Sequence, residues 1–166
     1  MNDHELIMKS FIFANAVSRA GKEIMSKVLT KYSINLVEYY ILYYLEKNPG
    51  STQYILLKYT TQTKSRVNQV ITKLEKKGYV KKKLELVGSL LKKPLYNTEL
   101  GNQIVQEGLE LMHSNTVDKL TPEEREKYEL YNREMLKILS MMITDLKVEV
   151  PGFFFLSEQD REFIER

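Results

Sequence analysis

The segment from Thr63 to Lys77 carries side chains that can hydrogen-bond to nucleic-acid bases. Its apolar residues are spaced i, i+3, i+4 and i+7, as on one face of a helix: Val67, Val70, Ile71 and Leu74. Arginine can form two hydrogen bonds to guanine, and asparagine and glutamine can do the same to adenine. We therefore predict that Arg66, Asn68 and Gln69 contact bases, the alternative being that they are ordinary solvated helix residues.

Lysines surround this segment and continue beyond it. Between residues 58 and 93 there are eleven basic residues against two acidic ones, a local charge of +9, whereas the rest of the chain has a charge of −6. Such an asymmetry attracts phosphate backbones, although a lysine-rich solvated surface is the simpler alternative. The predicted phosphate contacts are Thr63, Lys64, Ser65, Lys73, Lys81, Lys82, Lys83, Lys92 and Lys93.

Long helices are the elements expected to position these side chains, because the chain of 166 residues has only seven glycines and four prolines. Apolar residues recur at helical spacing from Glu5 to Lys31. Asn35, followed three residues later by Glu38, is typical of a capping box. This pattern predicts a second helix over about residues 36–47.

The next two helices are short and predict a helix-turn-helix. Ser51 is expected to cap a helix over residues 52–59. The expected apolar positions of that helix are Tyr54, Ile55 and Leu57. After a polar turn, Thr63 is the expected N-cap of the base-reading helix, and Gly78 ends it.

A β-hairpin and two further helices follow. Partial alternation of apolar and polar residues on both sides of residues 88–89 predicts the hairpin, whose second strand Pro94 weakens or places at an edge. Thr98 is expected to cap a helix that runs to about His113. Thr121 is expected to begin the last long helix, which runs to about residue 150.

This order predicts a mainly α fold with a small β-hairpin wing, a winged helix-turn-helix flanked by long N- and C-terminal dimerisation helices. We assign residues 33–97 to the winged helix-turn-helix and residues 1–32 and 98–166 to dimerisation. The last part includes the apolar tail Phe153–Leu156, which we expect to exchange between subunits or to cover the dimer core, and a short helix capped by Ser157 with Asp160. Helices too long for so small a module predict a homodimer.

Composition excludes several classes of function. The chain has no cysteine and only two histidines, far apart in sequence, so we expect neither thiol chemistry nor a metal site or other cofactor. It lacks a glycine-rich phosphate loop and a nucleophile elbow, so we expect no enzyme. With neither a secretory signal nor a long apolar run, the sequence predicts a cytoplasmic protein without a membrane partner.

Three stretches resemble the MarR (multiple-antibiotic-resistance regulator) family of winged-helix transcription factors. Residues 34–50 look like the family's second helix with its Pro-Gly end. The stretch 63–80, ending with residues 73–80, looks like the recognition helix and the turn into the wing. Asn97-Thr98-Glu99-Leu100-Gly101 looks like the "leucine-threonine-x-x-glycine" start of the next helix. The family's arginines near the wing tip are missing here, where residues 87–93 contain lysines but no arginine.

The resemblance implies a homodimeric regulator, more often a repressor than an activator, that binds double-stranded DNA at an inverted repeat. The rival hypothesis is a winged-helix module that binds protein through an apolar wing tip at Leu90 and Leu91 and through the tail Phe153–Leu156. A module of that kind would not need the base-reading side chains Arg66, Asn68 and Gln69.

Four tyrosines form an aromatic cluster on the second predicted helix: Tyr39, Tyr40, Tyr43 and Tyr44. They cover more than one helix face, so some must be core residues while others point to the junction between the DNA-binding and dimerisation helices. In proteins of the resembling family this junction often holds a small phenolic or amphipathic effector, which such rings would suit. The alternative is that all four are packing residues.

Overall fold

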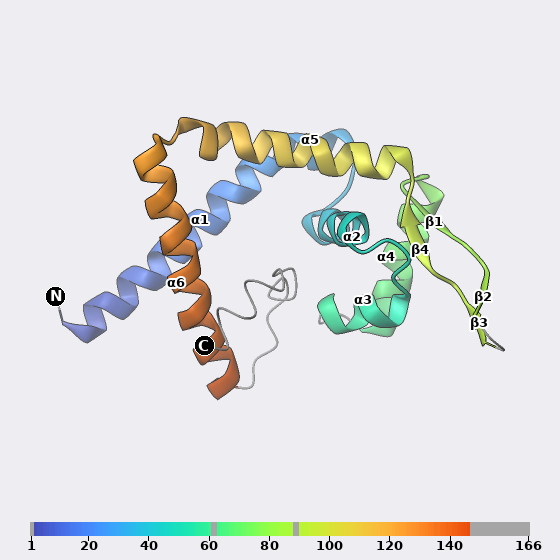
Figure 1. The fold of residues 1–166 in the computed structure, drawn as a ribbon, viewed down its shortest axis with the longest axis horizontal. Helices are drawn as coiled ribbons and strands as arrows, with labels where there is room; N and C mark the ends of the chain where they lie inside the picture. Colours follow the sequence, from blue (N-terminus) through green and yellow to red (C-terminus); the bar gives the residue numbers. More distant parts are fainter. Residues whose placement is uncertain (1, 61–62, 88–89, 147–166) are drawn as a thin grey trace.

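The computed structural model describes residues 2–60, 63–87 and 90–146. In chain order its elements are α1 (Asp3–Lys31), α2 (Leu36–Lys47), α3 (Gln53–Thr60), α4 (Lys64–Lys76), β1 (Val80–Lys82), β2 (Glu85–Val87), β3 (Leu90–Lys92), β4 (Leu95–Asn97), α5 (Glu99–Asn115), the 3-10 turn η1 (Val117–Lys119) and α6 (Pro122–Leu146). Figure 1 shows an arch, with α5 along the top, α1 and α6 on one side and the other elements on the opposite side. The predicted mainly helical class with a small hairpin is confirmed. The predicted apolar tail and the short helix after it lie outside the described residues.

Side chains cap α2 and α4 where the sequence predicted. Asn35 Oδ1 accepts a hydrogen bond from the Glu38 amide at 2.9 Å, and Glu38 Oε2 accepts one from the Asn35 amide at 3.0 Å, which completes a capping box. Thr63 Oγ1 accepts from the Arg66 amide at 3.2 Å. These bonds satisfy amides that have no partner within the helix, and so they fix the first residue of each helix.

The start of α3 differs from the prediction, because Ser51 does not cap it. The Ser51 hydroxyl donates to the Asn48 carbonyl at 2.8 Å, and the Ser51 carbonyl accepts from the Leu95 amide at 2.9 Å in an isolated β-bridge. The Thr52 carbonyl instead accepts the first helical hydrogen bonds. Pairing with a strand that is distant in sequence therefore overrides the local capping preference of serine.

The buried face of α3 also differs from the prediction. Tyr54, expected to be an apolar core position, is 66% exposed, whereas Leu56 is fully buried. Ile55 and Leu57 are half-buried against the core. A helix of eight residues makes little more than two turns, so its apolar spacing does not determine which face packs inward.

The core of the winged-helix region lies between α2, α3, α4 and α5. All four apolar residues predicted for one face of α4 are at most 5% exposed: Val67, Val70, Ile71 and Leu74. They belong to one cluster with Leu42 and Leu45 of α2, Leu56 of α3 and Ile104 of α5. Each buried aliphatic side chain contributes about 1.5–3 kcal/mol. This packing turns the polar faces of α4 outward.

The hairpin consists of two short antiparallel ladders. β1 pairs with β4, with Val80 opposite Asn97, and β2 pairs with β3, with Glu85 opposite Lys92. Between the ladders the Lys83 amide donates to the Pro94 carbonyl at 3.0 Å. Proline has no amide to donate, so regular pairing stops at this position. The predicted hairpin is present, and Pro94 interrupts its second strand.

Helix α5 lies very close to both the wing and α2, at its two buried glycines. A β-carbon at Gly101 would collide with the Tyr79 carbonyl, and one at Gly108 would collide with the Tyr39 phenol. Tyr39 crosses above Gly108 and donates its hydroxyl to the Val105 carbonyl at 3.0 Å. The missing side chains therefore allow α5 to pack directly on the DNA-binding half of the molecule.

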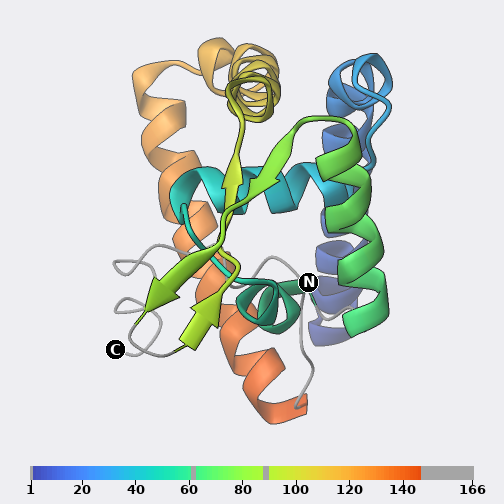
Figure 2. The ribbon, with the colours of Figure 1, turned by 90° about the vertical axis from the view of Figure 1, so that its right-hand side faces the viewer.

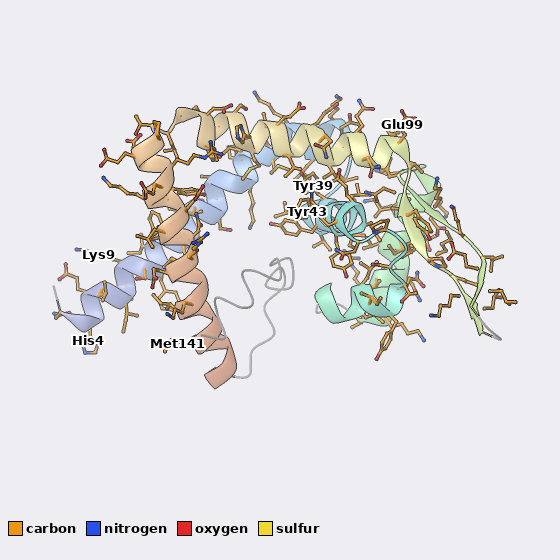
Figure 3. All side chains as sticks on the ribbon, viewed as in Figure 1. His4, Lys9, Tyr39, Tyr43, Glu99 and Met141 are labelled. Carbon is orange, nitrogen blue, oxygen red and sulfur yellow. The ribbon has the colours of Figure 1, made fainter. Side chains whose placement is uncertain are left out.

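Helices α1 and α6 cross on the far side of the arch (Figure 1), where the rings of Phe13 and Tyr131 meet edge to face at 5.7 Å. Many apolar side chains of these two helices are exposed in the single chain: Leu6, Ile7, Met8, Phe11, Ile12, Phe13, Val17, Tyr128, Leu130, Tyr131, Ile138 and Met141. Figure 3 labels Met141 on this side. Patches of this kind on a single chain mark interaction surfaces. No helix of the described residues is long and apolar enough to cross a membrane.

Candidate nucleic-acid interface

The outward side of α4 forms an open groove of about 640 Å³. The groove is lined by Ser65, Asn68, Gln69, Thr72, Lys73, Lys76 and Lys77. It therefore brings together two of the predicted base contacts, Asn68 and Gln69, with the predicted phosphate contacts Ser65 and Lys73. Arg66 is exposed but does not line the groove. It lies seven residues before Lys73 and so shares a side of the helix with that lysine.

Thr72 and Lys76 are groove residues that the sequence prediction missed. Both are exposed, and they lie on the same side of the helix as Ser65 and Gln69. Along this side each residue follows the previous one by three or four positions. The helical periodicity that predicted the core residues of α4 also indicates that Thr72 and Lys76 share a side with Gln69. Base contacts were predicted only near the start of the helix, and in its second half only Lys73 was predicted to contact phosphate.

Two lysines predicted to contact phosphate form internal ion pairs. Lys73 Nζ lies 2.6 Å from Oε1 of Glu38, a carboxylate that is only 2% exposed. Lys82 Nζ lies 2.5 Å from Glu75 Oε2. Their charges are partly neutralised where they stand, because an opposite charge at this distance competes with any incoming phosphate. Sequence alone could not show which lysines have carboxylate neighbours.

Other lysines of the region stay exposed without a carboxylate partner among the described residues: Lys64, Lys81, Lys92 and Lys93. Lys83 is exposed too, and its ammonium lies 4.8 Å from the centre of the Tyr96 ring. Figure 2 looks onto the face that carries α4 and the hairpin. This face of the molecule is therefore basic beside the groove.

The outer ladder of the hairpin also exposes leucines. Leu86 and Leu91 are opposite each other in the register of β2 and β3 and are 75% and 62% exposed. Leu84, just before β2, is 69% exposed. The wing thus carries the apolar surface predicted at Leu91, while the side chain of Leu90 lies outside the described ones.

A cavity of about 340 Å³ lies beside the tyrosine cluster, between α2 and the helices α1 and α5. We use the name dimerisation arm for α1, α5 and α6, the helices predicted to form the dimer. It is lined by Val17, Ser18, Gly21, Lys22, Met25, Leu36, Tyr39, Tyr40, Tyr43, Leu109 and Met112. Figure 3 shows Tyr39 and Tyr43 on α2 beneath α5. Three of the four tyrosines therefore share one cavity, whereas Tyr44 is a buried core residue that does not line it.

The cavity tyrosines differ in burial. Tyr39 is 5% exposed, and burial raises the pKa of its phenol to about 12, with a smaller contribution from the Glu46 carboxylate. Tyr40 is 42% exposed, and partial burial raises the pKa of its phenol above the ordinary value. Both phenols are therefore neutral near pH 7. The wall is mostly apolar, with Lys22 as a cation at its edge.

Comparison with known proteins agrees with this architecture. Residues 32–85 match the sequence model of the MarR family. A mutant MepR from a multidrug-resistant S. aureus clinical isolate is 23% identical, with a TM-score of 0.62 over 79% of this chain and 96% of that chain. The S. aureus MepR–DNA complex is 23% identical, with a TM-score of 0.58 over 78% and 98% of the two chains. The transcriptional regulator SlyA is 22% identical, with a TM-score of 0.62 over 82% and 97%. No curated protein matches the chain.

Proposed function

We infer that this chain, a winged-helix protein of the MarR family, is a DNA-binding transcription regulator whose helix α4 enters the major groove. The observation that carries the proposal is the polar groove of α4 beside a basic wing, in a fold shared with MepR, which has been solved bound to DNA. Asn68 and Gln69 line that groove and would read bases, together with Arg66. Lys64, Lys81, Lys92 and Lys93 hold phosphates.

We propose that the active species is a homodimer that represses transcription from an inverted repeat. The apolar residues exposed on α1 and α6 would bury one another in the dimer, which stabilises the association. Two copies of α4 would then contact half-sites about one helical turn apart, roughly 34 Å.

The cavity beneath the tyrosines would hold an effector in this proposal. Its apolar wall, its neutral phenols and Lys22 suit a small amphipathic or phenolic molecule. Because the cavity joins the arm helices α1 and α5 to α2, a ligand there would shift the arm against the DNA-binding region.

The first experiment is selection of genomic fragments by the purified protein at about 0.15 M salt, a physiological ionic strength. The wild type is compared with a variant that carries Arg66→Ala, Asn68→Ala and Gln69→Ala. A control variant, Asn102→Ala with Arg125→Ala, removes similar exposed side chains outside α4 and the wing.

We expect the wild type and the control to enrich a shared inverted repeat that the triple variant does not enrich. Each lost base contact should cost about 1–3 kcal/mol at its own position in the repeat. Weak binding that is equal in all three proteins and disappears with added salt would contradict the proposal. In that case the exposed leucines of the wing would favour the alternative hypothesis, a winged-helix module that binds another protein.

A further inference from the structure

The turn between α1 and α2 contacts both the dimerisation arm and the recognition helix, and Tyr32 takes part in both sets of contacts. On the arm side, the Tyr32 hydroxyl donates to Glu107 Oε1 of α5 at 2.7 Å. The neighbouring Lys31 donates to both oxygens of the same carboxylate at 2.8 Å. The end of α1 is thereby attached to the middle of α5 by three charge-assisted hydrogen bonds.

On the DNA-binding side, the end of α4 is attached to the backbone of the same turn. Lys77 Nζ donates to the Ser33 carbonyl at 2.6 Å and to the Tyr32 carbonyl at 3.3 Å. The Tyr79 hydroxyl donates to the Tyr32 carbonyl at 3.1 Å, and the two tyrosine rings meet edge to face at 6.2 Å. Helix α4 is therefore held against the C-terminus of α1.

The chemistry of this junction explains why it is specific. Carbonyls at a helix C-terminus lack partners within the helix and carry partial negative charge, so they attract a lysine ammonium. Ser33 has a φ of +52°, which turns the chain so that its carbonyl and that of Tyr32 can both reach Lys77. Hydrogen bonds from Lys31 and then Tyr32 hold the pKa of Glu107 below its usual range, so that Glu107 is an ionised acceptor near pH 7.

We propose that Tyr32 is a positioning residue that sets the angle of α4 relative to the dimerisation arm, and thereby the half-site spacing that the dimer accepts. This inference rests on the proposed function. Tyr32 is the residue of the turn whose side chain contacts α5 and whose carbonyl is bonded by both Lys77 and Tyr79. Because the arm relates the two protomers, a small rotation of α4 at this turn changes the distance between the two recognition helices.

The first test measures affinity by fluorescence anisotropy for the selected operator and for versions with one base pair inserted or deleted between the half-sites. The variants are Tyr32→Phe, which keeps the ring but removes the hydroxyl, and Glu107→Gln, which keeps the size of the acceptor. The control is Lys127→Gln, which breaks an exposed ion pair with Glu123 on α6.

We expect the wild type and the control to bind one half-site spacing more tightly than the others. In both variants the ratio of the affinities for the best and the altered spacings should fall about tenfold. The affinity for the best spacing should fall less than the preference does, because no DNA contact is removed. Unchanged preference in both variants would overturn the inference while leaving the proposed function intact. Absence of any selected operator would instead overturn the proposed function, and with it the role in spacing.

A second test does not depend on DNA. The chain has no cysteine, so Thr72→Cys on α4 and Ser114→Cys on α5 give two clean sites for spin labels. Double electron–electron resonance spectroscopy measures the distance between the two labels of one chain. Labelled protein is diluted into unlabelled protein so that labels on different chains do not contribute. We expect the distribution to broaden or shift in Tyr32→Phe and in Glu107→Gln but not in Lys127→Gln. Identical distributions in all proteins would overturn the positioning role, and a melting curve for each variant confirms that it is folded.

Discussion

Glu38 illustrates how one buried side chain joins the start of one helix to the side of another. Its Oε2 accepts from the Asn35 amide and its Oε1 pairs with Lys73 of α4. Glu38→Gln keeps the size of the side chain but removes the charge. We expect this change to lower the free energy of unfolding by about 1–3 kcal/mol, because hydrogen bonds to charged groups contribute more than neutral ones. Urea unfolding measures the effect.

The control for this prediction is Glu123→Gln, which breaks an exposed pair with Lys127. Exposed pairs contribute about 0–1 kcal/mol. A double-mutant cycle of Glu38→Gln with Lys73→Met isolates the energy of the pair. Equal losses in Glu38→Gln and Glu123→Gln would contradict the structural role of the buried carboxylate.

Tyr39 predicts a dependence of stability on alkaline pH. Burial raises the pKa of its phenol from 10.0 to about 12, so the folded state favours the neutral form. A pKa raised on folding contributes stability below pH 10, and this stability is lost as the pH rises towards about 12. We expect the melting temperature to fall less steeply in Tyr39→Phe than in the wild type over this range. Parallel curves would show that ionisation of Tyr39 is not linked to unfolding.

At the scale of elements, sequence predicted best where a local signal was strong. The caps Asn35 and Thr63 and the four buried residues of α4 were predicted correctly, because thirteen residues give the 3.6 period several turns to repeat. For the short helix α3 the predicted cap was wrong, and its apolar positions were only partly right, because Tyr54 is exposed and the fully buried Leu56 was not predicted. Its position depends on Ser51 pairing with Leu95, a contact between distant parts of the chain that no local pattern encodes.

The same distinction applies to the candidate site. Residue type and helical position indicated Asn68 and Gln69, which line the groove of α4. The ion pair between Lys73 and Glu38 spans 35 residues of sequence, so the sequence could not separate this lysine from the unpaired ones. The sequence also predicted that some of the tyrosines point to the junction with the dimerisation helices, but for the same reason it did not identify which residues of α1 and α5 line the cavity there.

The wing allows a test that separates paired from unpaired lysines. Lys92→Gln and Lys93→Gln together should weaken binding to every DNA sequence and reduce the salt slope of the binding constant by about 1 per lysine. Lys82→Gln should change the slope less, because Lys82 is paired with Glu75. Titrations at several salt concentrations measure the slopes. If the salt slope changed as much per lysine in Lys82→Gln as in the variant that carries both Lys92→Gln and Lys93→Gln, the assignment of phosphate contacts by exposure would be contradicted.

At the scale of the whole molecule, the apolar side chains exposed on α1 and α6 lead to a prediction about assembly. Phe11 is 59% exposed in the single chain, among apolar neighbours on α1. We expect the wild type to sediment at twice the 19.5 kDa mass of one chain, and Phe11→Glu to sediment as one chain with weaker operator binding. A charge buried without a partner in the interface opposes association.

The control for this prediction is Lys9→Gln, which changes an exposed residue of the same helix that pairs with Glu5. It should leave the mass and the operator affinity unchanged. Sedimentation velocity at several protein concentrations measures the mass. A Phe11→Glu variant that keeps the mass of two chains would show that the exposed face of α1 is not part of the interface.

The glycine at position 101 has a consequence for genetics. Every amino acid that a single nucleotide change can substitute for glycine has a β-carbon, and a β-carbon at this position collides with the Tyr79 carbonyl where α5 begins beside the wing. No missense change at this codon is therefore conservative. In a screen for cells that have lost regulation, we expect the codon for Gly101 to recur among independent isolates, although the residue lines neither the groove of α4 nor the cavity.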